Sequence, residues 1–216
     1  MTELATSRPI DGDEYVADTP GLRAFVSAVR AIVERSGGDV SAALDALRPD
    51  FAALLADQRW LPHRFADICP TSGMGGGIGQ WLLFRAGDRS LTLFSLVVPP
   101  GSSTPVHDHL AWGLVGLYQG EQEETVYCRV DDGHDGDHAT LVVDQVRSLT
   151  PGDFYTLLPP EGDIHMVKTI SAEPSVSIHL LGTDAGCIWR HAFEPDAGRV
   201  RSFRSGYSNV ACAEEE

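Results

Sequence analysis

Three histidines lie in two short motifs whose spacing is typical of a metal site. The sequence GSSTPVHDH (residues 101–109) ends with His107 and His109, and PEGDIH (residues 160–165) ends with His165. Residues i and i+2 of a strand share a face, with Cα atoms about 6.5 to 7 Å apart. His107 and His109 can therefore reach one ion, and His165 follows a tight turn onto a later strand. Nitrogen-only ligation suits Fe, Zn, Cu or Ni and disfavours Mg or Ca.

The alternative is that these are surface histidines of an inert barrel. The glycines and the proline that flank them at the motif positions favour the metal site. The histidines at positions 63, 134, 138 and 191 lack such a context, and we interpret them as surface or structural residues.

The composition indicates a folded globular protein. The chain has 216 residues, of which 43% are hydrophobic and 22% charged, enough for one large β-barrel domain with a helical attachment. A net charge of −15 repels phosphate backbones and anionic lipid, so we expect neither nucleic acid nor membrane partners. The acidic runs at residues 121–124, 131–137 and 214–216 are interpreted as solvated surface.

The predicted location is the cytoplasm. No stretch of 18 apolar residues is present, and the first 15 residues lack a basic region followed by an apolar run. The four cysteines are scattered without CxxC pairing, which predicts reduced thiols at Cys69, Cys128, Cys187 and Cys212.

The first third of the chain has helical periodicity. Residues 1–17 are polar and predict a loose arm, and Thr19 followed by a proline predicts the start of a helix that ends at Gly37. A second helical stretch covers residues 40–47, and Pro49 predicts the start of a third segment.

From Gly79 onward the pattern changes to short β-rich runs separated by turn residues, as in an antiparallel sandwich or barrel. The glycine-rich residues 72–79 lack the lysine of a phosphate loop and predict a flexible linker. We therefore predict a helical piece at residues 1–77, packed on a barrel at residues 78–216 that holds the metal site. The runs are residues 80–85, 90–98, 112–118, 124–130, 139–146, 153–159, 165–170, 175–181 and 188–193.

The two histidine motifs, with Gly120 downstream of the first, resemble the motifs of the cupin family. This resemblance implies a mainly β fold, a double-stranded β-helix or jelly-roll barrel, here with a short N-terminal α-helical segment. The usual cupin has a glutamate ligand seven residues before the downstream glycine, where this chain has Gly113. The resemblance therefore implies three neutral histidines and no carboxylate.

A three-histidine cupin without the glutamate resembles the cysteine dioxygenase family of thiol dioxygenases, over about residues 78–205. The segment PVHDHLAWGLVGLYQGEQEETVY is similar to the bacterial branch, especially the 3-mercaptopropionate dioxygenases. This resemblance implies Fe(II), O2 and a small thiol carboxylate (3-mercaptopropionate- or cysteine-like) that is oxidised to a sulfinate. It is compatible with a monomer or a homodimer.

The resemblance also implies roles for residues outside the metal site. Ser177 and His179 match the first two members of a Ser-x-His-x-Tyr relay beside the iron, but Leu181 stands at the tyrosine position. Gln80 and Arg190 match positions that bind the substrate carboxylate. The alternatives are that Ser177 is an ordinary strand serine, that His179 is an interior histidine and that Arg190 forms a surface ion pair.

Two further departures bear on the activity. Gly113 replaces the cysteine of the Cys–Tyr crosslink known in mammalian members, so that crosslink cannot form. The missing tyrosine leaves open an oxygenase of another class, such as one that cleaves β-dicarbonyls, or a non-catalytic metal-binding barrel. Tyr155, just before His165 on a neighbouring predicted strand, is the first candidate for a replacement hydroxyl.

Overall fold

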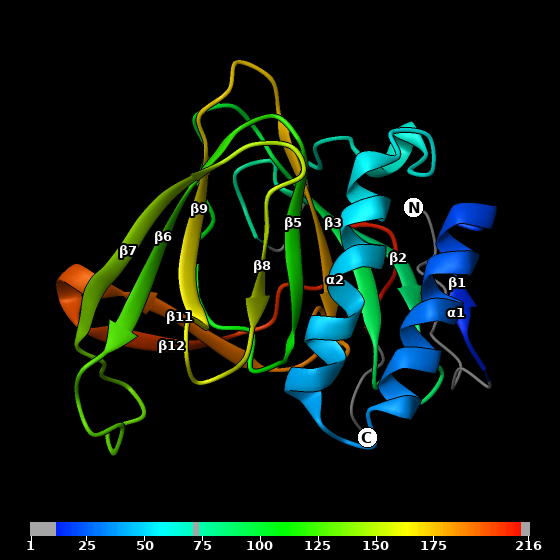
Figure 1. Cartoon of the computed structure of the whole chain (residues 1–216). Helices are drawn as coiled ribbons and strands as arrows, with labels where there is room; N and C mark the ends of the chain where they lie inside the picture. Colours follow the sequence, from blue (N-terminus) through cyan, green and yellow to red (C-terminus); the bar gives the residue numbers. More distant parts are fainter. Residues whose placement is uncertain (1–11, 71–73, 213–216) are drawn as a thin grey trace.

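Two antiparallel sheets face one another and form the barrel of this computed structural model, which describes residues 12–70 and 74–212 (Figure 1). The first sheet has the strand order β1 (Glu14–Tyr15), β2 (Gly79–Arg85), β3 (Thr92–Val98), β10 (Ser175–Leu181), β5 (Gly113–Gln119) and β8 (Phe154–Leu157). The second has the order β12 (Arg199–Phe203), β11 (Arg190–Glu194), β4 (Val106–His107), β9 (Ile164–Thr169), β6 (Gln122–Arg129) and β7 (Leu141–Leu149).

The chain crosses repeatedly between the two sheets, which is the connectivity of a double-stranded β-helix. From β5 it passes to β6 and β7 in the other sheet, returns to β8, crosses to β9 and returns again to β10. The predicted fold class, a mainly β cupin barrel with an N-terminal helical segment, is confirmed. All nine predicted β-rich runs contain strands, while the short strands β1, β4 and β12 were not predicted. Two 3-10 turns complete the described elements, η1 (His63–Phe65) and η2 (Pro195–Ala197).

Two helices, α1 (Pro20–Arg35) and α2 (Val40–Ala56), cover the outer face of the first sheet (Figure 1). The side chain of Thr19 accepts a hydrogen bond from the Leu22 amide at 3.3 Å, which confirms the predicted helix start. Apolar side chains of both helices share one buried cluster with Leu114 and Ile178 of the sheet. The domain boundary proposed at residues 77 and 78 stays a prediction.

The predicted break at Pro49 is wrong, because α2 continues through it. A proline inside a helix removes one backbone hydrogen bond and costs about 3 kcal/mol. The buried face that runs from Leu44 and Leu47 to Phe51 and Leu55 offsets this cost. The ring of Phe51 packs edge-on against Phe154 of β8, with centroids 5.5 Å apart.

The predicted loose arm is wrong for residues 14–17. Glu14 and Tyr15 pair with Arg85 and Phe84 of β2, and the Glu14 carboxylate lies 2.7 Å from the Arg85 guanidinium. This pairing spans about 70 residues of chain, so local sequence patterns do not reveal it. Residues 1–11 of the predicted arm lie outside the described residues.

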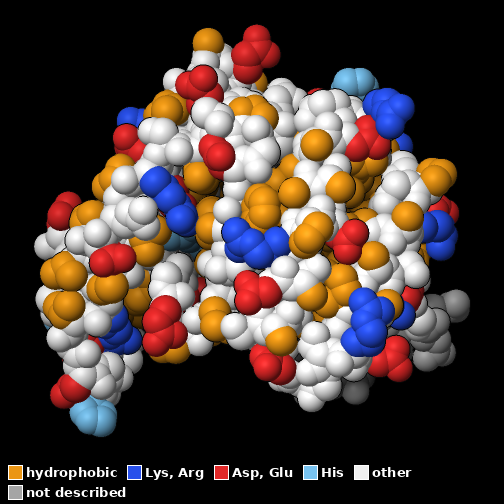
Figure 2. All heavy atoms as spheres, in the orientation of Figure 1, with side chains coloured by type: hydrophobic (Ala, Val, Ile, Leu, Met, Phe, Trp, Pro, Cys, Tyr) orange, Lys and Arg blue, Asp and Glu red, His pale blue; other side chains and the backbone are white. Residues whose placement is uncertain are grey.

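Part of the predicted glycine linker, residues 71–73, also lies outside the described residues. Residues 75–77 form a turn of three positive-φ glycines that leads into β2. No helix within the described residues is long and apolar enough to cross a membrane. On the face shown in Figure 2, Asp and Glu side chains are interspersed with Lys, Arg and hydrophobic ones.

The prediction of four reduced thiols is wrong, because Cys187 and Cys212 form a disulfide with Cα atoms 5.3 Å apart. The segment after β12, residues 204–212, carries Cys212 back across β2 and is called the C-terminal strap below. Backbone atoms of Gln80 bond the main chain and hydroxyl of Ser208 at 2.6 and 3.0 Å, and Asn209 bonds Leu82 in both directions. A long-range return of this kind leaves no spacing signal in the sequence.

Candidate metal centre

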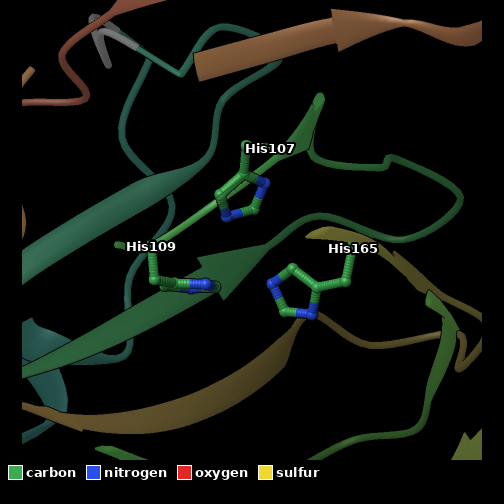
Figure 3. Close-up of side chains that lie close together, drawn as sticks. All are labelled: His107, His109 and His165. Carbon is green, nitrogen blue, oxygen red and sulfur yellow. The ribbon is translucent and has the colours of Figure 1, made fainter. Parts of the chain in front are cut away.

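The three predicted ligands meet inside the barrel (Figure 3). His107 of β4 pairs in register with His165 of β9, and His109 follows two residues after His107. Their ligand atoms lie within 4.8 Å of one another, and the three residues are 1 to 3% exposed. The rings lean toward one point, with centroids 4.8 to 5.0 Å apart. This buried three-histidine group suits a metal ion.

Hydrogen bonds on the outer side orient two of the rings. The Nδ1 atom of His107 lies 2.9 Å from the carbonyl oxygen of Pro105, and Nδ1 of His165 lies 2.6 Å from a carboxylate oxygen of Glu124. The Nε2 atom of His165 is buried and has no hydrogen-bond partner among the described residues. Burial holds the pKa values of His107 and His109 well below the usual range. The rings of His107 and His109 are therefore neutral and available as ligands.

Two aspartates fix the backbone that carries the histidines. Asp163 accepts hydrogen bonds from the amides of His109 and Leu110 at 3.0 and 3.1 Å, and Leu110 has a φ of 54°. Asp108 accepts from the amide of His191 at 2.8 Å and lies 2.6 Å from its Nδ1 atom. His191, interpreted above as surface or structural, is thus a structural partner of the loop between the ligands.

Glu124 was missed as a site residue, and its interpretation as part of a solvated run is wrong. It is 0% exposed, and its carboxylate bonds both His165 and the guanidinium of Arg147. Burial would raise the pKa of Glu124, but the hydrogen bonds from His165, Arg147 and Tyr155 lower it to about 2. Strand alternation could have found Glu124, because it shares the inner face of β6 with Gln122.

Tyr155 lies behind His165. Its hydroxyl is 3.3 Å from the Nδ1 atom of His165, on the ring edge that faces Glu124. The guanidinium of Arg147 covers the Tyr155 ring, 4.1 Å from its centroid. Tyr155 therefore belongs to the outer shell of His165.

Ser177 and His179 project from the inner face of β10. The Ser177 hydroxyl lies 3.0 Å from Nε2 of His179, whose ring stacks on Phe94 at a centroid distance of 4.6 Å. Burial lowers the pKa of His179 to about 3, so its ring is neutral, and its Nδ1 atom has no hydrogen-bond partner among the described residues. Leu181 is 0% exposed and packs in an interior cluster with Phe94 and Val115.

Gln80 and Arg190 meet at Ser205, a residue of the C-terminal strap that the sequence analysis missed. The Ser205 hydroxyl accepts hydrogen bonds from the Gln80 amide at 3.1 Å and from the Arg190 guanidinium at 2.9 Å. Arg190 also donates to the carbonyl oxygen of Asp108 at 2.7 Å and lies over the Phe203 ring at 4.7 Å. Its Nε atom has no partner among the described residues. Burial lowers the pKa of Arg190 to about 10, so it remains charged at neutral pH.

Comparison with known proteins gives partial structural similarities and no matching family model. A cupin 2 domain-containing protein from Halorhodospira halophila aligns with a TM-score of 0.41 and 18% identity over 55% of this chain and 72% of that one. A protein with a double-stranded β-helix domain from Klebsiella pneumoniae aligns with a TM-score of 0.41 and 16% identity, over 60% and 95% of the two chains.

An oxalate oxidase in complex with glycolate aligns with a TM-score of 0.35 and 17% identity, over 44% of this chain and 43% of that chain. The chain therefore spans less than half the length of that enzyme. The two facing sheets of the chain itself form a double-stranded β-helix, and the buried histidine triad inside it suits a metal ion.

Proposed function

We propose that the protein is an Fe(II)-dependent thiol dioxygenase acting on a small thiol carboxylate. Both atoms of O2 are added to the sulfur, so that a thiol R–SH becomes a sulfinic acid R–SO2H. The sulfur loses four electrons and O2 gains them, and no external reductant is consumed. The observation that carries the proposal is Arg190, a buried cation with an unpartnered Nε atom, bonded to the main chain between two of the histidines.

The charge of Arg190 lies close enough to the triad to act on it. Beyond burial and the neighbouring histidines, this charge also lowers the pKa values of His107 and His109. A guanidinium binds a carboxylate through a planar fork that lysine cannot reproduce. Arg190 thus supports a substrate with an anionic end held near the metal centre.

Gln80 and Ser205 extend this anionic subsite. The Ser205 hydroxyl oxygen accepts two hydrogen bonds, from Gln80 and Arg190, which leaves its own proton to be donated. A substrate carboxylate would accept hydrogen bonds from that hydroxyl group and from the Nε–H group of Arg190. These donors hold the far end of the substrate and thereby orient its sulfur.

The donor set fits the proposed metal, because three imidazole nitrogens suit iron. Bound Fe(II) supplies a Lewis-acidic centre that favours thiolate over thiol and a path for electrons from sulfur to O2. The neutral His179, held by Ser177 and stacked on Phe94, offers its Nδ1 atom for a hydrogen bond to the substrate or a water.

A second candidate function is an oxygenase that acts on a non-thiol substrate such as a β-dicarbonyl. Leu181 favours it, because an aliphatic side chain replaces the hydroxyl of the thiol dioxygenase relay and packs in the interior cluster. A cavity without that hydroxyl is more apolar and suits a less polar substrate.

The cytoplasmic location and the state of monomer or homodimer stay predictions. The Cys187–Cys212 disulfide bears on the location, since disulfides persist mainly in oxidising compartments.

The test is O2 consumption by Fe(II)-loaded protein with cysteine, cysteamine, 3-mercaptopropionate, mercaptosuccinate and a β-diketone. We expect one O2 per sulfinate formed, with a carboxylate thiol preferred over cysteamine. Turnover of the β-diketone alone would replace the proposal by the second candidate. Absence of turnover with every compound, while iron remains bound, would indicate a non-catalytic metal-binding cupin.

A further inference from the structure

We infer that Glu124 is a positioning residue of the metal centre, supplying from behind His165 the negative charge that the three-histidine ligand set lacks. This inference rests on the proposed metal site alone. It does not depend on the thiol chemistry, so the two proposals can fail separately.

The backbone leaves no room for a carboxylate ligand at Gly113. A Cβ atom built there would lie 2.1 Å from the carbonyl oxygen of Leu180 and 2.5 Å from a methyl group of Leu181. Any side chain at this position would force β5 and β10 apart. A carboxylate beside the triad must therefore come from another position, and Glu124, 2.6 Å from Nδ1 of His165, lies nearer than Asp163, 3.5 Å from Nδ1 of His109.

Glu124 on β6 provides that charge through one hydrogen bond. Its Oε1 atom lies 2.6 Å from Nδ1 of His165, and its Oε2 atom is bonded by Arg147. Both oxygens are thus engaged, and the carboxylate cannot itself turn toward the ion without losing a charged partner. Complete burial strengthens each of these contacts, because little solvent screens them.

The hydrogen bond has two consequences for His165. A carboxylate acceptor keeps the proton on Nδ1, which leaves the lone pair of Nε2, unpartnered in the structure, for an ion. The negative charge also makes the imidazole a stronger donor, as in carboxylate–histidine–metal arrangements. Arg147 bonds the other carboxylate oxygen from the β7 side, where the guanidinium lies over the Tyr155 ring.

The experiment measures Co(II) affinity by competition with a chelator, together with the melting temperature of each apoprotein. Glu124→Gln should weaken Co(II) binding by about 10- to 100-fold. Glu123→Gln is the matched control, because it makes the same change on the same strand at a half-buried position of the opposite face, and it should leave the affinity unchanged. Arg147→Met removes the cation and keeps the carboxylate, so Co(II) should bind no more weakly than to the wild type.

Two results would overturn the inference. One is wild-type Co(II) affinity in a folded Glu124→Gln protein. The other is an equal loss of affinity in Glu124→Gln and Arg147→Met, which would mean that the pair only supports the barrel. If Glu124→Gln does not fold, ¹⁵N NMR of the wild-type apoprotein decides the question. The ring signals of His165 are identified as those that disappear in His165→Ala. In the wild type they should show the proton on Nδ1, and a proton on Nε2 would contradict the role of Glu124.

Discussion

Arg190→Lys tests whether the buried cation recognises the substrate carboxylate. Lysine keeps the positive charge but has no planar fork. It cannot at once reach the carbonyl of Asp108 and the hydroxyl of Ser205, contacts that Arg190 makes at 2.7 and 2.9 Å. It also loses the flat stacking of the guanidinium over Phe203. The substituted head group is therefore free to move, and the Nε–H donor is gone.

The size of the effect follows from the hydrogen bond that is lost. A hydrogen bond to a charged group contributes about 1.5 to 3 kcal/mol. Loss of one such bond to the carboxylate corresponds to a fall in kcat/KM of roughly 10- to 160-fold. Cysteamine has no carboxylate, so its kcat/KM should change by less than about threefold.

The assay is O2 uptake with 3-mercaptopropionate and cysteamine at matched iron content. Arg201→Lys is the control, because Arg201 lies on the neighbouring strand β12 with an exposed side chain paired to Glu194. Equal losses for the two thiols in Arg190→Lys would refute the carboxylate role, as would an unchanged kcat/KM for 3-mercaptopropionate.

Four further outcomes are expected. His107→Ala should abolish stoichiometric iron binding and activity and leave the circular dichroism spectrum of the barrel; retained iron would contradict the metal site. Leu181→Tyr should speed the oxidation of small thiols by up to roughly tenfold, because it restores a hydroxyl on the face of β10 that carries His179; an unchanged or lower kcat would argue against this. Cys212→Ser should lower the free energy of unfolding by about 3.5 kcal/mol, the chain-entropy value for a loop of 25 residues, as measured by urea denaturation. The folded-state pKa of Glu124, about 2, lies below its ordinary value of 4.5, so its stabilising effect is present above pH 4.5 and is lost as the pH falls through about 2. The Glu124→Gln protein should not show this loss of stability between pH 4.5 and about 2.

Periodicity and turn residues were enough to predict the barrel and the first helix. The strands β1 and β4 escaped because two residues carry too little alternation to be recognised, and β12 escaped although it is as long as the predicted β11. The unbroken α2 escaped because the rule for proline is local, whereas the burial of Phe51 and Leu55 is a tertiary effect.

The three metal ligands could be predicted from the sequence, but the partners that hold them were missed. The motif spacing indicated His107, His109 and His165, and the structure brings them together. Ser205 carries no motif, and it reaches Gln80 only because the C-terminal strap returns over β2. The burial of Glu124 could have been predicted from strand alternation. The run of four acidic or amide residues at 121–124 was a stronger signal, and it favoured an exposed position.

The histidine triad and Ser205 lie on different segments of the chain, because Ser205 belongs to the C-terminal strap and the histidines do not. The strand β4, the residues that follow it and β9 hold the histidines, whereas the strap places Ser205 beside Gln80 and Arg190. Substitutions within residues 204–209 can change the surroundings of Gln80 and Arg190 while the ligand-bearing strands keep their hydrogen bonds. Changes in the polarity around Gln80 and Arg190 can thus arise in the strap alone, and a library confined to these few positions tests whether the proposed substrate preference can be altered there.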